Sequence, residues 1–261
     1  MTLIVAWLSH DQKKPSAAYI AADSRISCDK SVWDCAKKVF VSKTQPMIFG
    51  YCGSVLVPST LLAQLVDSID SGFLFNPAEP VASKWQSLCA FFQRGLKGSL
   101  PFMSKAPSYV LGIHRTGDNC FSNAVYTIQG LHVALSHEPI TLNRSSVLHE
   151  LGSGAPAYRE IAKHTASKNC NVSVSRIYFA SFCRAIRSNK VSTVGGPPQL
   201  AALRTKGGGQ ILPVKFGQSL WQQGMKLEAV SYRGECFDET FQRINPETLN
   251  LVEGAQRQPL R

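Results

Sequence analysis

The amino-acid sequence predicts an α+β protein in which helices cover antiparallel sheets. Strand-like segments come in consecutive groups, two helical segments follow each of the first two groups, and a last pair of strands completes the order. Elements that are grouped in this way, instead of alternating, indicate antiparallel sheets with helices on their outer faces. The order fits two sheets packed face to face with a helical layer outside each, a four-layer αββα sandwich.

The first fifty residues predict two successive antiparallel hairpins. An apolar segment, Leu3–Leu8, is followed by a polar turn and by a second apolar segment, Ala17–Ala22. β-Branched and aromatic residues predict a third strand at Lys37–Val41, and the apolar segment Pro46–Cys52 predicts a fourth.

The rest of the chain repeats this change between strand and helix. Apolar side chains recur at helical spacing between Pro58 and Gly72 and again from about Pro80 to Gly95, and a loop is expected from Gly95 to Pro107. Further strands are expected at Ser108–His114, Cys120–Thr127, Leu131–Leu135 and Val147–Leu151. The last expected elements are helices at about Ala155–Ala166 and Ser173–Arg187, and strands at Gln199–Thr205 and Gln210–Lys215.

The composition changes after Phe216, where the chain becomes polar and irregular. We therefore predict a domain over residues 1–216 and a C-terminal extension over residues 217–261. The extension is expected to pack on a neighbour or to stay partly mobile.

Composition excludes several classes of protein. The 261 residues contain no apolar run of membrane-spanning length and no signal peptide, so we expect a cytoplasmic protein without a membrane partner. The net charge of +11 is spread along the chain without a nucleic-acid motif, so no specific nucleic-acid partner is predicted, although an acidic partner remains open. The eight cysteines form no C-x-x-C pair, and we expect neither a metal nor a cofactor.

Thr2 stands at the start of the first predicted strand. Methionine aminopeptidase normally removes Met1 before a residue as small as threonine, which would leave a free α-amine beside the Thr2 hydroxyl. A hydroxyl is a weak nucleophile that needs an adjacent base, and an N-terminal threonine supplies that base from its own amine. Many proteins begin Met-Thr, so the interpretation depends on the rest of the chain.

Several short segments follow one another in a fixed order and complete a pattern. They are Thr2, Ala21-Ala22-Asp23-Ser24-Arg25, Lys37-Lys38-Val39, Tyr51-Cys52-Gly53-Ser54 and Leu151-Gly152-Ser153-Gly154. Together they resemble the proteasome-type N-terminal-nucleophile hydrolases, a group with proteasome β-subunits, heat-shock peptidases and bacterial homologues. Arg187-Ser188-Asn189 and Val194-Gly195-Gly196-Pro197-Pro198 most resemble the bacterial ancestral proteasome homologues. The resemblance spans residues 2 to 215.

The resemblance implies a catalytic role for each matching residue. The hydroxyl of Thr2 would attack an amide carbonyl while its α-amine takes the proton. Lys38 would supply a positive charge that keeps the amine neutral, and Asp23 would be the counter-ion of this lysine. The backbone N–H of Gly53 would form an oxyanion hole.

Two further residues complete the implied site. Ser153 would hydrogen-bond the Thr2 amine and relay a proton. Asn189 occupies the place where proteasome β-subunits usually carry an aspartate; its amide can orient the amine but cannot compensate a positive charge.

The resemblance also implies a substrate and an assembly. The positions of the family's specificity pocket correspond to Ile26, Ala36, Phe40, Tyr51 and Val55, so cleavage after apolar side chains is expected. Peptides or unfolded proteins would be the substrates of a homo-oligomeric ring or related multimer, which an unfoldase could serve.

Other interpretations of these residues remain open. A non-catalytic ring or scaffold subunit would keep the fold without the activity, and a small-molecule amidase would have a closed pocket. Individually, Asp23 with Arg25 suits a solvated ion pair, Gly53 suits a turn, and the segment around Ser153 suits a helix N-cap.

Overall fold

The computed structural model describes residues 2–11, 14–28, 31–97, 106–168, 174–228 and 232–253. Some expectations concern residues outside these ranges. They are the removal of Met1, most of the predicted loop from Gly95 to Pro107, the helix start at Ser173, and the end of the C-terminal extension.

The first sheet contains the strand that begins beside Thr2. Its order is β10-β1-β2-β11-β12, and all its pairs are antiparallel. The strands are β1 (Ile4–Asp11), β2 (Lys14–Ala22), β10 (Ser146–Leu151), β11 (Gln199–Arg204) and β12 (Gln210–Leu212). The predicted first hairpin is confirmed, with Ile4 opposite Ala22.

Successive residues of β1 face opposite sides of this sheet because side chains alternate along a strand. Ile4 and Ala6 belong to a core shared with the second sheet, whereas Val5 and Trp7 belong to a core shared with α3 and α4. Both faces are buried, which is why the first strand is a continuous apolar run instead of an alternating one.

The second sheet has the order β5-β6-β7-β8-β9, again with antiparallel pairs. Its strands are β5 (Val39–Val41), β6 (Met47–Gly53), β7 (Ser108–Gly117), β8 (Cys120–Gln129) and β9 (His132–Ile140). The hairpin of β5 and β6 confirms the second predicted hairpin.

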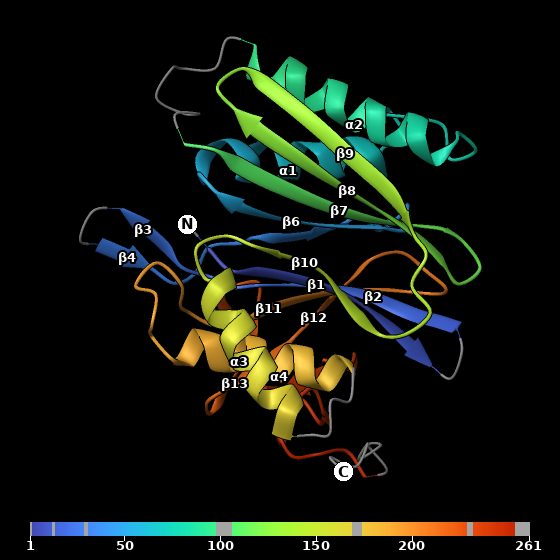
Figure 1. The fold of residues 1–261 in the computed structure, drawn as a ribbon. Helices are drawn as coiled ribbons and strands as arrows, with labels where there is room; N and C mark the ends of the chain where they lie inside the picture. Colours follow the sequence, from blue (N-terminus) through green and yellow to red (C-terminus); the bar gives the residue numbers. More distant parts are fainter. Residues whose placement is uncertain are drawn as a thin grey trace.

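Four helices cover these two sheets (Figure 1). They are α1 (Leu56–Asp70), α2 (Val81–Leu96), α3 (Ala155–Lys168) and α4 (Ser175–Arg187). In Figure 1, α1 and α2 lie above the second sheet, and α3 and α4 lie below the first. Pro58 lies within the first turn of α1, where its missing N–H removes no helical hydrogen bond, so the helix begins before the predicted start.

Two further sheets were not expected from the sequence. One has the order β15-β14-β13-β16-β17, and the other is the ribbon of β3 and β4 that projects from the body of the molecule in Figure 1. Their strands are β3 (Ile26–Cys28), β4 (Ser31–Trp33), β13 (Val214–Phe216), β14 (Ser219–Gln222), β15 (Met225–Leu227), β16 (Cys236–Asp238) and β17 (Arg243–Ile244).

The predicted four-layer αββα sandwich is therefore wrong as a description of the whole fold. The described chain is 40% strand and 25% helix and contains four separate sheets, so the fold is β-rich. The sequence hid this because the additional strands have only two to four residues each, too few to show a period of two.

The described part of the C-terminal extension packs on the chain itself. β14 pairs with β13, and Phe241 lies edge-on to Trp7 and Tyr19 of the first sheet, with ring centroids 6.1 and 5.3 Å away. Arg187 donates two hydrogen bonds to the carboxylate of Glu239. The division at residue 216 stays a prediction.

Candidate active site

Thr2 lies two residues before β1 and is 1% exposed. Its carbonyl oxygen accepts the backbone N–H of Gly154 at 3.3 Å, so the turn before α3 holds the start of the chain in place. Gly152 in this turn has a φ of +92°, and a Cβ there would overlap the Thr2 carbonyl oxygen. The first glycine of the predicted Gly-Ser-Gly segment is therefore required by this close approach.

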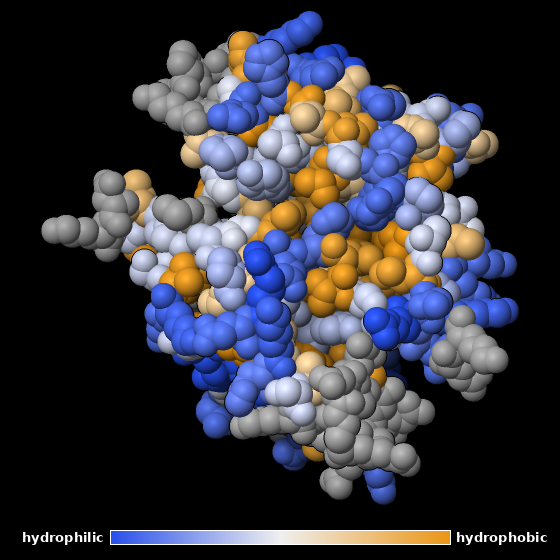
Figure 2. Space-filling model, in the orientation of Figure 1, coloured by the Kyte–Doolittle hydropathy of each residue, from blue (hydrophilic) through white to orange (hydrophobic). Residues whose placement is uncertain are grey.

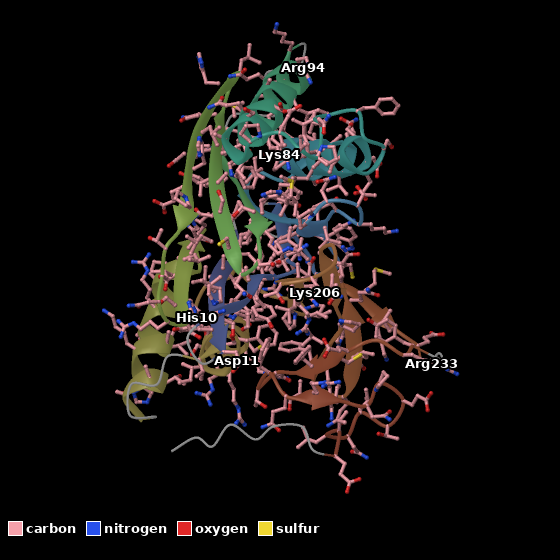
Figure 3. All side chains as sticks on the ribbon, turned by 90° about the vertical axis from the view of Figure 1, so that its right-hand side faces the viewer. His10, Asp11, Lys84, Arg94, Lys206 and Arg233 are labelled. Atoms are coloured by element: carbon pink, nitrogen blue, oxygen red, sulfur yellow. The ribbon has the colours of Figure 1, made fainter. Side chains whose placement is uncertain are left out.

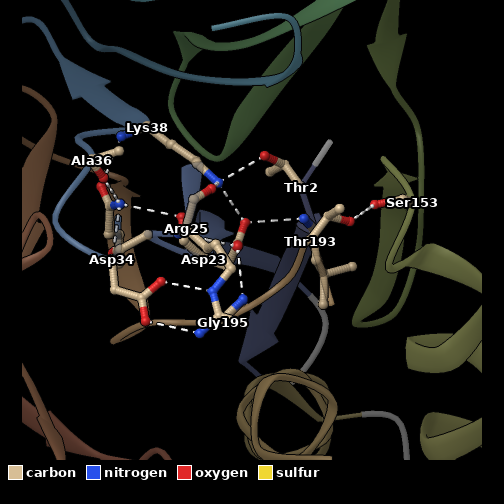
Figure 4. A network of polar contacts seen from close by, with 12 residues as sticks. Thr2, Asp23, Arg25, Asp34, Ala36, Lys38, Ser153, Thr193 and Gly195 are labelled. Atoms are coloured by element: carbon tan, nitrogen blue, oxygen red, sulfur yellow. Dashed lines mark hydrogen bonds and ion pairs between the residues drawn. The ribbon is translucent and has the colours of Figure 1, made fainter. Parts of the chain in front are cut away.

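The Lys38 ammonium connects Thr2 to Asp23 (Figure 4). Its Nζ donates to Thr2 Oγ1 at 2.7 Å and to Asp23 Oδ1 at 2.8 Å. A third hydrogen bond, to the carbonyl oxygen of Arg25, is 2.5 Å long. Both charged side chains are fully buried. Three residues that are far apart in the sequence, and to which the resemblance assigned linked roles, thus meet in one network.

Asp23 is held by backbone donors as well as by the lysine. It follows the end of β2, and its two carboxylate oxygens accept the N–H groups of Leu3, Arg25 and Gly195 at 3.1, 3.3 and 3.0 Å. A buried carboxylate needs such partners, because an unpaired charge is strongly disfavoured away from water. The negative charge is therefore fixed in position beside Lys38.

Burial and charge act in opposite directions on Lys38. Burial disfavours the charged form and holds the pKa of Lys38 below its ordinary value, while the adjacent Asp23 carboxylate favours the charged form. A lysine in this environment releases its proton more readily than one in water.

Sequence analysis missed Gln199, the first residue of β11. Its side chain is 1% exposed and lies against the backbone of both charged residues. The Oε1 atom accepts the N–H of Lys38 at 2.9 Å, and Nε2 donates to the carbonyl oxygen of Asp23 at 3.3 Å. A lone glutamine in an apolar strand gives no motif by which it could have been found.

Arg25 fixes the loop on the far side of Asp23. Its guanidinium donates to both carboxylate oxygens of Asp34 at 2.7 and 2.9 Å and to the carbonyl oxygen of Ser192 at 3.1 Å. The hydrogen bonds from Arg25 hold the pKa of Asp34 below its ordinary value. A Cβ at Gly195 would overlap the guanidinium, so a larger residue there would displace the Arg25 side chain from this position.

The two remaining motif residues near Thr2 have different surroundings. Gly53 ends β6 with a φ of +99°, and a Cβ there would overlap the carbonyl oxygen of Pro107. The Ser153 hydroxyl is 2.9 Å from Thr193 Oγ1, a partner that the sequence did not suggest. The expected contact between Ser153 and the Thr2 amine concerns a chain without Met1 and stays a prediction.

Asn189 is not brought into this network. It is exposed, follows the C-cap of α4, and has a φ of 50°, in the left-handed region that asparagine tolerates. Asn189 has the position of a helix-terminating residue in the described structure, and a catalytic role for it stays a prediction.

A groove of about 980 Å³ lies beside the network. Gly53 and Gly152 line it together with Ser153, and Figure 2 shows the surface hollowed where the β3–β4 ribbon leaves the body of the molecule. Of the predicted pocket residues, Ile26 and Val55 line this groove. The other three, Ala36, Phe40 and Tyr51, are buried in the interior.

Groove residues outside the predicted set add charge and a thiol. Glu150 and Arg159 form an ion pair of 2.8 Å in its lining. Burial raises the pKa of Glu150. Burial also raises the pKa of Cys52 to about 12, so this thiol is a poor nucleophile despite its place beside Gly53.

The C-terminal extension reaches the segment that carries Lys38. The turn between β14 and β15 places Gln223 Nε2 3.1 Å from the carbonyl oxygen of Val39. Gly224 in the same turn has a φ of +85°, and a Cβ there would lie 2.8 Å from the backbone of Cys35. The extension therefore supports the backbone on both sides of Lys38.

Figure 3 shows Lys84, Arg94, Lys206 and Arg233 at separate places along the molecule, so these four cations form no shared patch. No helix in the described ranges is both long and apolar enough to cross a membrane. Seven cysteines of the described chain are free, and the same residues contain no group of three or more side chains suited to a metal ion.

Comparison with known proteins finds likenesses among solved structures alone. No protein-family model matches the chain, and no curated protein matches it. Among solved structures, it is similar to the "Anbu (Gly-1) mutant" from Hyphomicrobium sp. strain MC1, with a TM-score of 0.49 and 13% identity. The match covers 78% of this chain and 82% of the other. A likeness this distant supports no inference of its own.

Proposed function

We propose that this chain is an N-terminal threonine hydrolase that cleaves amide bonds, with peptides as its substrates. The observation that carries the proposal is the position of Lys38 Nζ, 2.7 Å from Thr2 Oγ1 and 2.8 Å from Asp23. A buried ammonium that donates to a hydroxyl stabilises the alkoxide that forms when this hydroxyl loses its proton. The resemblance of the sequence to proteasome-type hydrolases points to the same activity.

The first half of the reaction forms an ester. Thr2 Oγ1 attacks the carbonyl carbon of the substrate, and the hydroxyl proton passes to the Thr2 α-amine, directly or through one water. The carbonyl oxygen becomes an oxyanion, for which the Gly53 N–H is the proposed donor. The carbon–nitrogen bond then breaks, and the proton moves from the α-amine to the departing amine.

The second half restores the enzyme. The α-amine takes a proton from a water molecule, whose oxygen attacks the ester carbonyl. The ester bond to Thr2 Oγ1 breaks, the hydroxyl regains a proton, and the carboxylic acid leaves.

Both halves require a neutral α-amine, and Lys38 favours this state. A free α-amine has a pKa of about 8 in water, and a positive charge nearby lowers it. The amine exists only after Met1 is removed, so this removal is the activating step of the proposal.

The groove next to Thr2 is the proposed substrate site. Ile26 and Val55 supply an apolar wall, which supports the expected preference for apolar side chains at the cleaved position. We further propose, from the resemblance alone, that copies of the chain form a ring or related homo-oligomer, which an unfoldase could serve. The cytoplasmic location also stays a prediction.

Covalent labelling tests the proposed activity. Intact mass should first show a purified protein that lacks one methionine. A threonine-directed β-lactone or epoxyketone should then add one inhibitor mass, which peptide mapping should place on Thr2. Thr2→Ala should abolish labelling and turnover, whereas Ser9→Ala, a hydroxyl deletion on the same strand, should leave both unchanged.

Other outcomes separate the rival functions. A protein that loses Met1 but reacts with neither inhibitor and hydrolyses no amide would be a scaffold subunit instead. Labelling at Thr2 with turnover of small amides but not of peptides would indicate an amidase. A monomer by light scattering would refute the ring and leave the hydrolase proposal standing.

A further inference from the structure

We propose that Gln199 is the positioning residue of the Lys38–Asp23 pair and thereby sets the pH at which Thr2 becomes active. The proposal rests on the hydrolase function argued above. Gln199 begins β11 in the first sheet, and Lys38 directly precedes β5 in the second. The Gln199 side chain therefore connects the two sheets at the place where Lys38 and Asp23 lie.

The Gln199 amide satisfies backbone groups of both segments. Oε1 accepts the N–H groups of Lys38 and Val39 at 2.9 and 3.4 Å. Nε2 faces the carbonyl oxygens of Asp23 and Ala36 at 3.3 and 2.6 Å. Donors thus face the oxygen and acceptors face the nitrogen, which fixes the orientation of the amide.

A fifth polar contact, which shares the two hydrogens of Nε2 among three acceptors, extends the link beyond Asp23. Nε2 donates to Ser24 Oγ at 2.9 Å, and the Ser24 hydroxyl donates to the carbonyl oxygen of Pro197 at 2.6 Å. Gln199 is 1% exposed, so removal of its amide would take a hydrogen-bond partner from buried backbone groups of Lys38, Asp23 and Ala36. The segments of Lys38 and Asp23 would have to shift to find other partners.

Such a shift would change the chemistry of Thr2 through Lys38. The ammonium lies 2.7 Å from Thr2 Oγ1, and its effect on the α-amine weakens as the distance increases. If Lys38 moves away, the pKa of the α-amine returns toward about 8, so more of the amine is protonated at a given acidic pH. The acidic limb of the pH–rate profile then moves to higher pH.

A purely structural role for Gln199 predicts a different result. It would reduce the amount of folded protein and lower the rate by one factor at every pH at which the fold persists. It would leave the midpoint of the acidic limb unchanged, so the pH profile separates the two roles.

The experiment uses the full chain after Met1 removal. The rate of Thr2 labelling by a β-lactone and the kcat for a peptide substrate are measured from pH 5 to 9 for the wild type and for Gln199→Met. Methionine has similar length but makes no amide hydrogen bonds. We expect kcat to fall by about 10²-fold, the order associated with a misplacement of roughly 1 Å, and the limb to rise by about half a pH unit or more.

Asn123→Leu is the matched control. Asn123 is also a buried amide, and its side chain contacts His149 at 2.8 Å in a different part of the two sheets. This variant tests the effect of losing a buried amide without moving Lys38. The acidic limb of its pH–rate profile should have the same midpoint as in the wild type.

The outcomes distinguish this proposal from the hydrolase function itself. A wild type that is never labelled at Thr2 overturns the function. If the wild type is labelled at Thr2 but the acidic limb of Gln199→Met has the wild-type midpoint, the positioning role alone is overturned. If Gln199→Met does not fold, Gln199→Asn is measured in the same way. Asparagine keeps an uncharged amide at this position, but its side chain is one methylene shorter than that of glutamine and cannot reach both segments. An unmoved limb in that variant also overturns the proposal.

Discussion

Replacing Lys38 with methionine removes the cation that Thr2 and Asp23 share. Breaking a buried ion pair by removing one partner typically costs about 3–5 kcal/mol, because the other charge is left buried without compensation. Asp23 retains three backbone N–H donors in the variant, so we place the loss at the lower end, about 3 kcal/mol. With a urea slope of about 3 kcal/mol per molar, the unfolding midpoint would fall by about 1 M.

Lys37→Met is the control for this prediction. Lys37 is the exposed neighbour of Lys38, and its ammonium lies 4.4 Å from the centre of the Phe40 ring. Loss of that contact costs about 0.5–1 kcal/mol. Lys38→Met should also lower the rate of Thr2 labelling by at least about 10²-fold, whereas Lys37→Met should keep the wild-type rate.

Two results would refute the reasoning about Lys38. One is an equal loss of stability in the two lysine variants, and the other is wild-type labelling of Thr2 in Lys38→Met. The double variant Lys38→Met/Asp23→Asn gives a further check. It should lose less stability than the sum of the single changes, because it leaves neither charge unpaired.

Further predictions concern a glycine, a histidine and a thiol. Gly152→Ala should lower the free energy of unfolding by roughly 2 kcal/mol or more, because its φ is positive and a Cβ there would also overlap the Thr2 carbonyl oxygen. Gly130→Ala, where φ is +59° and the space is open, should lower it by only about 1 kcal/mol. Burial lowers the pKa of His114 from 6.5 to about 4, so the folded state loses stability as pH falls from about 6.5 toward 4. At about 1.4 kcal/mol per pH unit, roughly 3 kcal/mol should be lost by pH 4 in urea titrations, and His114→Phe should not show this loss. At pH 8 iodoacetamide should modify the exposed Cys28 well before the buried Cys52, as mass spectrometry of digests would show.

Each of these three predictions can fail clearly. Equal losses in the two glycine variants would mean that the turn relaxes around the new Cβ. Unchanged acid sensitivity in His114→Phe would assign that sensitivity to other groups. Alkylation of Cys52 as fast as that of Cys28 would mean that the groove opens far enough to expose it.

Helices and strands were predicted best from the sequence where the burial of apolar side chains is sufficient to determine the secondary structure. The apolar runs before and after the first turn form β1 and β2, and the helical spacing after Gly53 forms α1, because each must bury a face. The meeting of Thr2, Asp23 and Lys38 was also predicted, but from the resemblance of short motifs and not from burial.

Other contacts between distant segments could not be predicted. The partner of Ser153 turned out to be Thr193, and the amide of Gln199 spans two sheets, yet neither residue stands in a recognisable pattern. After Phe216, β14 and β16 pair with β13, and Phe241 packs on Trp7, so the structure of this part depends on surfaces that the local sequence does not contain.

The turn between β14 and β15 has a consequence for the order in which the protein is made. Gln223 bonds to the carbonyl oxygen of Val39 across a separation of 184 residues. Ribosomes add about 5–20 residues per second, so the support behind Lys38 is synthesised roughly 10–40 s after the lysine itself. A nascent chain can pair β1 with β2 during that interval, but the segment that carries Lys38 still lacks one of its supports. The contact with Gln223 thus delays completion of the candidate site until nearly all of the described chain has been translated.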